Sequence, residues 1–229
     1  DHCFGMCKDV ERLIDQSFGN NKLDYTINVD LMRQKLARDL ANPNNTSEIN
    51  FIISDIIGDP VVRYSEIQTK LMNSLHAENI NDLRAQISLG ARLHNIGKIC
   101  VPLSLIDGKM KPSDSQFDQI AVHVKKGEQI LKKFGFPKEI VVMALYHHTR
   151  KDVYRKLLGL DDGTNNESII PIQTKLIEII DVYNALTTPR SYRPSVHSRL
   201  SALNITKSMI GNDQEYKELF KLFVKYLLN

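Results

Sequence analysis

Residues 172–193 read IQTKLIEIIDVYNALTTPRSYR, and they indicate the fold more clearly than any other stretch of the chain. Apolar side chains recur every three or four positions from Ile172 to Leu186, which predicts a buried helix face that ends before Pro189. Asp181 lies inside this apolar run. An ionised carboxylate that is buried without a partner costs several kcal/mol. We therefore expect a cation beside Asp181, and a metal ion held by histidines is one natural source of it.

Helical spacing continues through most of the chain. In the first part it predicts helices over 10–18, 28–40 and 47–57, and no stretch alternates apolar and polar residues for long enough to predict a strand. Ser113 followed by Gln116 is typical of a capping box at the start of a helix. These patterns predict an all-α helical bundle, which we divide into a small N-terminal helical lobe and a main helical domain, over residues 1–60 and 61–229.

Composition excludes several classes of protein. The chain has 229 residues, with 30 Lys and Arg against 27 Asp and Glu, and it lacks Trp. This balanced charge argues against a nucleic-acid polymer as partner. The longest apolar stretch, Ile140–Tyr146, is far shorter than the roughly 20 residues that span a bilayer, so we expect no transmembrane segment. Three cysteines do not form a disulfide framework, which favours a cytoplasmic location, and the start at Asp1 suggests a piece of a longer protein.

Histidines gather at the ends of the apolar helices. His94 ends one apolar stripe, His123 lies on the next helix, and His147 and His148 end a third. Adjacent helical residues point about 100° apart, so two neighbouring ligands imply that this helix ends at the site. Imidazole and carboxylate ligands suit Fe, Mn, Zn, Co or Ni. Taken singly, His94 or His123 is better explained as a core histidine with ordinary hydrogen bonds than as a metal ligand.

The order of these motifs resembles a known family. The sequence HNIGK at 94–98, a histidine at 123, YHH at 146–148 and DVYNALT at 181–187 are similar to the HD-GYP branch of the HD metal-dependent phosphohydrolases. The corresponding family patterns are LLHDIGKIGVP, a following histidine, YHHE..DGSGYP and ADVYDALTSDRPYR. The resemblance covers about residue 61 to the C-terminus. It implies an HD-type helical bundle that hydrolyses the bacterial second messenger cyclic di-GMP with two or three metal ions.

The resemblance also implies roles for individual residues. Lys98 matches the lysine after the metal motif and is the expected catalytic residue. Arg190 and Arg193 match basic residues near the substrate phosphates, although solvated surface charges would explain them equally well. Five residues stand at the positions of the family's metal ligands, namely His94, His123, His147, His148 and Asp181.

Three departures from the family pattern indicate a degenerate site. Asn95 replaces the aspartate that bridges the metals in the family, and an amide is a poor bridge because it is uncharged. Tyr64 replaces an early histidine ligand, and the Gly-Tyr-Pro signature is absent after His148, where residues 149–158 look helical. We therefore expect one ion at most, a divalent transition metal of the Fe, Mn or Zn class, held by the histidine triad of His123, His147 and His148.

Three functions remain open from the sequence. The first is a regulatory HD-GYP-like signalling domain with impaired catalysis, which acts through cyclic di-GMP or a related nucleotide and through other signalling domains or proteins. The second is a working metal-dependent phosphodiesterase that hydrolyses cyclic di-GMP or a related phosphoester. The third is a structural helical module without metal. Metal content separates the third from the other two, and turnover of cyclic di-GMP separates the first from the second.

Overall fold

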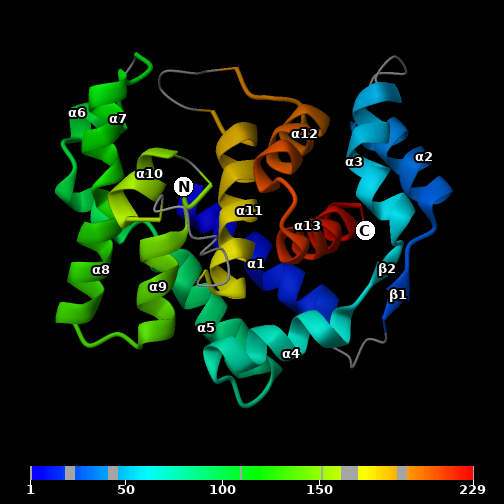
Figure 1. The fold of residues 1–229 in the computed structure, drawn as a ribbon, viewed down its shortest axis with the longest axis horizontal. Coiled ribbons are helices and arrows are strands. Elements are labelled where there is room, and N and C mark those ends of the chain that lie inside the picture. Colours follow the sequence, from blue (N-terminus) through cyan, green and yellow to red (C-terminus); the bar gives the residue numbers. More distant parts are fainter. Residues whose placement is uncertain are drawn as a thin grey trace.

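A computed structural model describes residues 2–18, 24–40, 46–108, 110–150, 152–160, 170–189 and 195–228. Helices dominate these residues, so the predicted all-α bundle is confirmed (Figure 1). In chain order they are α1 (His2–Phe18), α2 (Val29–Leu40), α3 (Thr46–Gly58), α4 (Tyr64–Leu75), α5 (Ile80–Leu93), the 3-10 helix η1 (Ile96–Cys100), α6 (Leu103–Ile106), α7 (Asp114–Ala121), α8 (His123–Lys133), α9 (Lys138–Tyr146), α10 (Asp152–Leu158), α11 (Ile172–Thr187), α12 (Arg199–Ile210) and α13 (Gln214–Leu227).

Side-chain caps fix where several helices start. Ser113 Oγ accepts the backbone N–H of Gln116, and the Gln116 side chain accepts the backbone N–H of Ser113 at 2.8 Å, so the predicted capping box is confirmed. Asp213 Oδ1 accepts the N–H of Tyr216 at 3.0 Å at the start of α13. Such caps satisfy N–H groups that have no partner within the helix.

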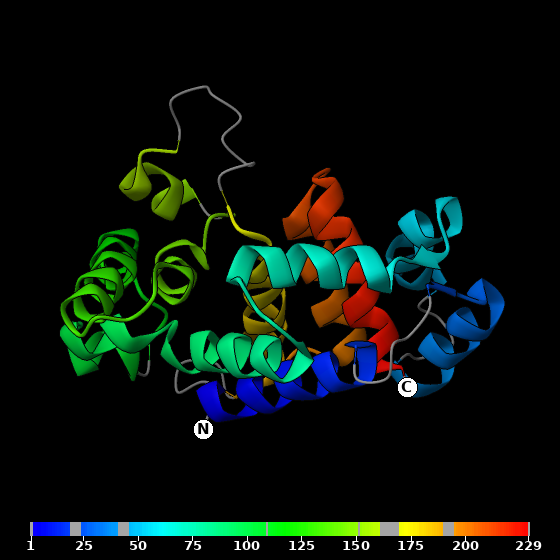
Figure 2. The ribbon, with the colours of Figure 1, turned by 90° about the horizontal axis from the view of Figure 1, so that it is seen from below.

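Helix α11 lies at the centre of the bundle. It packs against α1, α4, α9, α12 and α13 (Figures 1 and 2). Every residue from Ile172 to Asp181 is buried, and the helix ends at Thr187, two residues before Pro189. The buried helix predicted from the apolar stripe is confirmed, and with it the burial of Asp181.

The N-terminal helices pack on the rest of the chain. Helix α1 begins at His2, eight residues earlier than predicted, and lies along α5 and α11, whereas α2 and α3 lie beside α12. Residues from both predicted parts, such as Val10, Ile53, Leu83 and Leu176, share one hydrophobic core. The division at residue 60 stays a prediction.

A short strand pair joins the loop before α2 to the loop before α4. Strand β1 (Tyr25–Thr26) runs antiparallel to β2 (Val61–Val62), and the N–H of Ile27 donates to the carbonyl of Pro60 at 2.7 Å. No strand was predicted from the sequence, because two residues are too few to show an alternating pattern. Among the described residues, no helix combines the length and the apolar character that a membrane span requires.

Candidate metal centre

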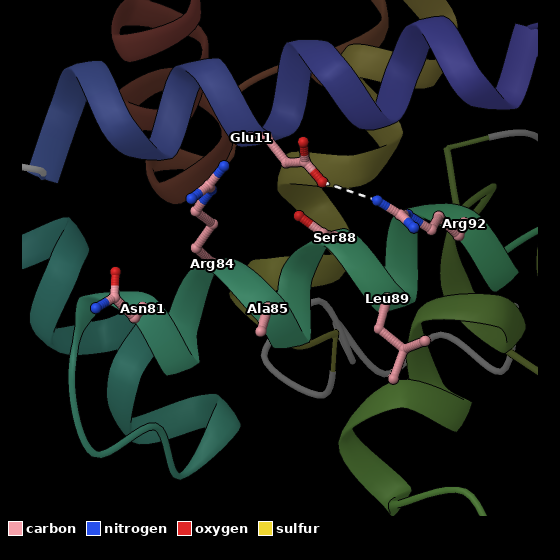
Figure 3. Close-up of a pocket in the computed structure, with 7 residues that line it drawn as sticks. All are labelled: Glu11, Asn81, Arg84, Ala85, Ser88, Leu89 and Arg92. Carbon is pink, nitrogen blue, oxygen red and sulfur yellow. Dashed lines mark hydrogen bonds and ion pairs between the residues drawn. The ribbon is translucent and has the colours of Figure 1, made fainter.

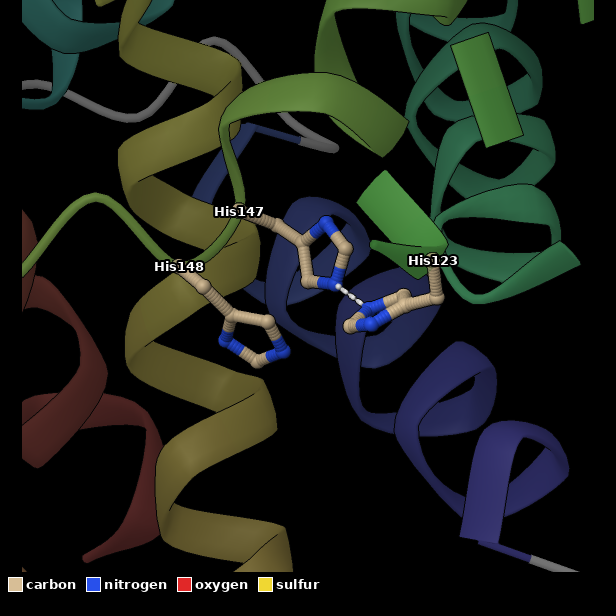
Figure 4. A group of neighbouring side chains, drawn as sticks. All are labelled: His123, His147 and His148. Carbon is tan, nitrogen blue, oxygen red and sulfur yellow. Dashed lines mark hydrogen bonds between the residues drawn. The ribbon is translucent and has the colours of Figure 1, made fainter. Parts of the chain in front are cut away.

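Four buried histidines meet where three helices begin or end. His94 directly follows α5, His123 opens α8, and His147 and His148 directly follow α9. Three of the rings are fully buried and that of His148 is nearly so. Figure 4 shows the rings of His123, His147 and His148 turned toward a common point. The prediction that α9 ends at the paired histidines is confirmed.

Gly97 allows the turn after His94 to approach α8. A Cβ atom at this position would lie 1.9 Å from the carbonyl oxygen of His123 and 2.5 Å from the backbone nitrogen of Gly127. Because both neighbours are backbone atoms, they cannot move aside as the end of a flexible side chain can. A glycine is therefore required for the close packing that brings His94 beside His123.

Backbone contacts orient three of the rings. The Nδ1 atoms of His94, His123 and His147 each lie 2.7–3.0 Å from the carbonyl oxygen of the residue three positions earlier. A carbonyl oxygen can only accept a hydrogen bond, so each Nδ1 carries the proton. Each Nε2 then carries a lone pair. A metal-ligating histidine shows the same arrangement, because its second ring nitrogen is held by a carbonyl or a carboxylate.

The spacing of the histidine triad fits one transition-metal ion. The Nε2 atoms of His123 and His147 lie 3.3 Å apart, and potential ligand atoms of all three triad histidines lie within 4.8 Å of one another. Metal–nitrogen bonds of about 2.0–2.1 Å in a tetrahedral site place two nitrogens roughly 3.3 Å apart. Two lone pairs at this distance repel unless a cation lies between them. Both the donor types and the spacing therefore suit a divalent transition metal.

At the other end of the cluster, Nε2 of His94 already has a hydrogen-bond partner. Nδ2 of Asn95 donates to Nε2 of His94 at 2.6 Å, and the same Nε2 lies 3.4 Å from Oδ1 of Asp181. The amide therefore engages the lone pair with which His94 would bind a metal. Oδ1 of Asn95 is buried and has no hydrogen-bond partner in the described part of the chain.

Burial keeps two of the triad imidazoles neutral. Desolvation, followed by the charge of Lys98, lowers the pKa of His123 to about 4. Desolvation, followed by the neighbouring histidines, holds the pKa of His147 well below its ordinary value. A neutral imidazole is the form that binds metal.

A cavity of about 160 Å³ opens beside the triad. Its polar wall includes Lys98 and Asp181 together with His123 and His148, and its remaining wall is mainly apolar, with Phe117 and Ile106 among the residues there. The structure thus brings Lys98 to the same cavity as the predicted ligands. A larger cavity of about 560 Å³ lies between α1 and α5, away from the histidines, and its residues are shown in Figure 3.

Tyr64 lies apart from this cluster. Tyr64 is buried at the start of α4, with its ring edge-on to Phe18 and the ring centroids 6.4 Å apart. Its correspondence to the family's early histidine stays a prediction. Arg190 and Arg193 lie outside the described residues.

Two buried residues near the histidines and the turn that follows them were not predicted from the sequence. Tyr154 on α10 places its ring centroid 4.7 Å from that of His148 and 5.9 Å from that of His123, and it lines the cavity. The segment was correctly predicted to be helical, but its position over the site was not. Glu178 is a second buried carboxylate in the stripe of Asp181, and the rule applied to Asp181 would have found it.

Comparison with known proteins agrees with this helical site. The protein-family model described as an HD domain matches residues 37–215, so the chain belongs to the HD domain family. Members of this family depend on metal ions, in keeping with the histidine triad.

Curated relatives indicate a narrower relationship. A 3'3'-cGAMP-specific phosphodiesterase of Vibrio cholerae is 30% identical over 49% of this chain and 24% of its own length. A cyclic di-GMP phosphodiesterase response regulator of Xanthomonas campestris is 29% identical over 47% of this chain and 28% of its own length. A cyclic di-GMP phosphodiesterase of Pseudomonas aeruginosa is 28% identical over 61% of this chain and 32% of its own length.

These matches confirm the predicted relation to cyclic di-GMP phosphodiesterases. The chain spans about a quarter to a third of the length of these relatives. No solved structure matches the chain.

Proposed function

We propose that this chain is a signalling domain that binds one divalent transition metal at the histidine triad and has impaired phosphodiester hydrolysis. Its ligand would be cyclic di-GMP or a related nucleotide, as the names of its relatives suggest. Other signalling domains or proteins would be its further partners. When bound, the metal would act as a Lewis acid and activate a water molecule.

The contact between Asn95 and His94 carries this proposal. The amide hydrogen bond at 2.6 Å occupies Nε2 of His94, so this histidine and Asp181 form a weak second metal position. Two-metal hydrolysis requires a pair of ions about 3.5–4 Å apart that clamp the attacking and leaving oxygens. A chain that holds only the triad ion lacks this clamp.

The size of the cavity supports the same proposal. Small-molecule sites usually enclose about 300–1,000 Å³, whereas the space beside the triad is about 160 Å³. The Tyr154 ring on α10 occupies part of its wall.

A second candidate function is an active metal-dependent phosphodiesterase. It is favoured by the presence of Lys98 and Asp181 in the same cavity as the triad, because a lysine can stabilise charge on a phosphate. Cyclic di-GMP or a related phosphoester would then be the substrate.

Metal analysis and a turnover assay on one sample test the proposal. We expect about one transition-metal ion per chain in protein purified without chelators, with three histidine ligands as in many mononuclear sites. His123→Ala should lower this content several-fold. His76→Asn is the matched control, because His76 is an exposed histidine in a left-handed conformation that asparagine tolerates.

Cyclic di-GMP should bind without multiple turnovers when manganese or iron is supplied. Turnover that His123→Ala abolishes would replace the proposal by the second candidate. A metal content that is the same in the wild type, His123→Ala and His76→Asn would refute the triad as a metal centre.

A further inference from the structure

Helix α11 buries a second carboxylate one turn before Asp181. Glu178 has no exposed surface, and it does not line the cavity beside the triad. Desolvation raises its pKa to about 7, although hydrogen bonds from Tyr216 and the N–H of Arg150 favour its ionised form. A carboxyl group is costly to bury, so the groups that hold it indicate what it does.

Glu178 holds the turn that carries the paired histidines. Its Oε1 accepts the backbone N–H of Arg150 at 3.1 Å, and its Oε2 accepts the hydroxyl of Thr149 at 3.3 Å. Thr149 and Arg150 directly follow His147 and His148 in the chain. Figure 4 shows both histidines projecting from this connection, which runs beside α11.

The same carboxylate is tied to α13. The hydroxyl of Tyr216 donates to Oε2 of Glu178 at 2.5 Å. The guanidinium of Arg150 lies 4.2 Å from the centroid of the Tyr216 ring and 3.2 Å from Oδ2 of Asp213. Lys175 on α11 also pairs with Asp213, at 3.0 Å. The turn is therefore fastened to α11 and α13 by partners that do not belong to the metal site.

From these contacts we infer that Glu178 is a positioning residue, whose carboxylate sets the orientation of the His147–His148 ligand pair through the backbone of Arg150 and the hydroxyl of Thr149. The inference rests on the proposed metal centre. Metal sites tolerate errors of only about 0.2 Å in ligand distance, so a small shift of this turn would weaken binding. Loss of the acceptor would leave the N–H of Arg150 without its partner and release the turn.

Two variants of Glu178 separate positioning from general stability. Glu178→Leu removes both acceptor oxygens. Glu178→Gln keeps one oxygen that can accept the N–H of Arg150, and its amide NH2 group can donate to the hydroxyls of Thr149 and Tyr216, which then accept instead of donating. Lys207→Met is the matched control for the loss of a buried charge. Lys207 is also buried, with 6% of its surface exposed, but it donates to Ser54 and to the carbonyl of Phe51, on helix α3.

The primary measurement is NMR of the metal-free protein. Glu178→Leu should shift or broaden the imidazole nitrogen signals of His147 and His148 and raise the amide exchange rate of Arg150 at least tenfold. Glu178→Gln and Lys207→Met should leave these signals close to those of the wild type. Unchanged signals and exchange in Glu178→Leu would overturn the inference, and so would equal changes in Lys207→Met.

Cobalt binding, followed by its visible absorption, is the second measurement. Loss of a residue that orients ligands typically weakens metal affinity about 10–100-fold, and we expect this loss in Glu178→Leu with recovery in Glu178→Gln. A wild type that binds no cobalt would count against the proposed metal centre. The NMR comparison would still decide whether Glu178 positions the histidines.

Discussion

Replacement of Glu178 by glutamine should change how stability depends on pH. Desolvation raises the pKa of this carboxyl from its ordinary value of 4.5 to about 7 in the folded chain. At a pH between 4.5 and about 7, Glu178 keeps its proton in the folded chain but has released it in the unfolded chain. The contribution of this carboxyl to the stability of the wild type is therefore fully present below pH 4.5 and is lost as the pH rises through about 7. A glutamine does not titrate, so Glu178→Gln lacks this loss.

The size of the effect follows from the same two pKa values. A change of one in pKa corresponds to about 1.4 kcal/mol, so the rise from 4.5 to about 7 corresponds to about 3 kcal/mol. The free energy of unfolding of Glu178→Gln, relative to that of the wild type, should increase by this amount between pH 4.5 and pH 8. Buried histidines titrate in both proteins, so their contributions cancel in the difference.

Urea denaturation with a chelator present, at several pH values, measures this difference directly. The chelator removes the contribution of bound metal from both proteins. A difference that stays constant within about 1 kcal/mol across the range would show that Glu178 titrates near its ordinary pKa. The account of its burial and of its hydrogen bonds would then be wrong.

Three further predictions concern the histidine site. Gly97→Ala should lower the free energy of unfolding by about 3 kcal/mol or more in urea denaturation, since its Cβ would collide with backbone atoms of α8. Gly127→Ala is its control, because a Cβ there meets only ordinary contacts at 3.5 Å or more, and this helical position should be stabilised by about 0.5–1 kcal/mol. In the metal-free protein, His123 should contribute a loss of about 3 kcal/mol as the pH falls from 6.5 through about 4, because the unfolded chain protonates this histidine before the folded chain does. The free energy of unfolding of the wild type, relative to that of His123→Gln, should fall by this amount in urea denaturation, and a constant difference would contradict the low pKa. Asn95→Asp alone should leave the metal content near one ion per chain, because the second metal position, beside His94 and Asp181, would still lack a fourth ligand. Two ions per chain in elemental analysis would contradict the alignment of Tyr64 with the family's early histidine.

Local patterns in the sequence predicted the elements that depend on local chemistry. The apolar spacing of α11 and the capping box at Ser113 both report interactions within a few residues, and both are confirmed. The paired histidines predicted the end of α9 for the same reason, because two neighbouring side chains cannot face one point inside a helix. The pairing of β1 with β2 joins residues 35 and 37 positions apart, and no local pattern indicates it.

The two carboxylates of α11 show where sequence reasoning stops. One physical rule applies to both Asp181 and Glu178, namely that a buried carboxylate needs a partner, and the sequence places them in one apolar stripe. Their partners differ, because Asp181 faces His94 at 3.4 Å, whereas Glu178 faces Arg150 and Tyr216, which lie 28 and 38 residues away in the chain. The rule can therefore predict that each carboxylate has a partner, but only the packing of α9, α11 and α13 decides that one faces the candidate metal centre and the other holds its ligand turn.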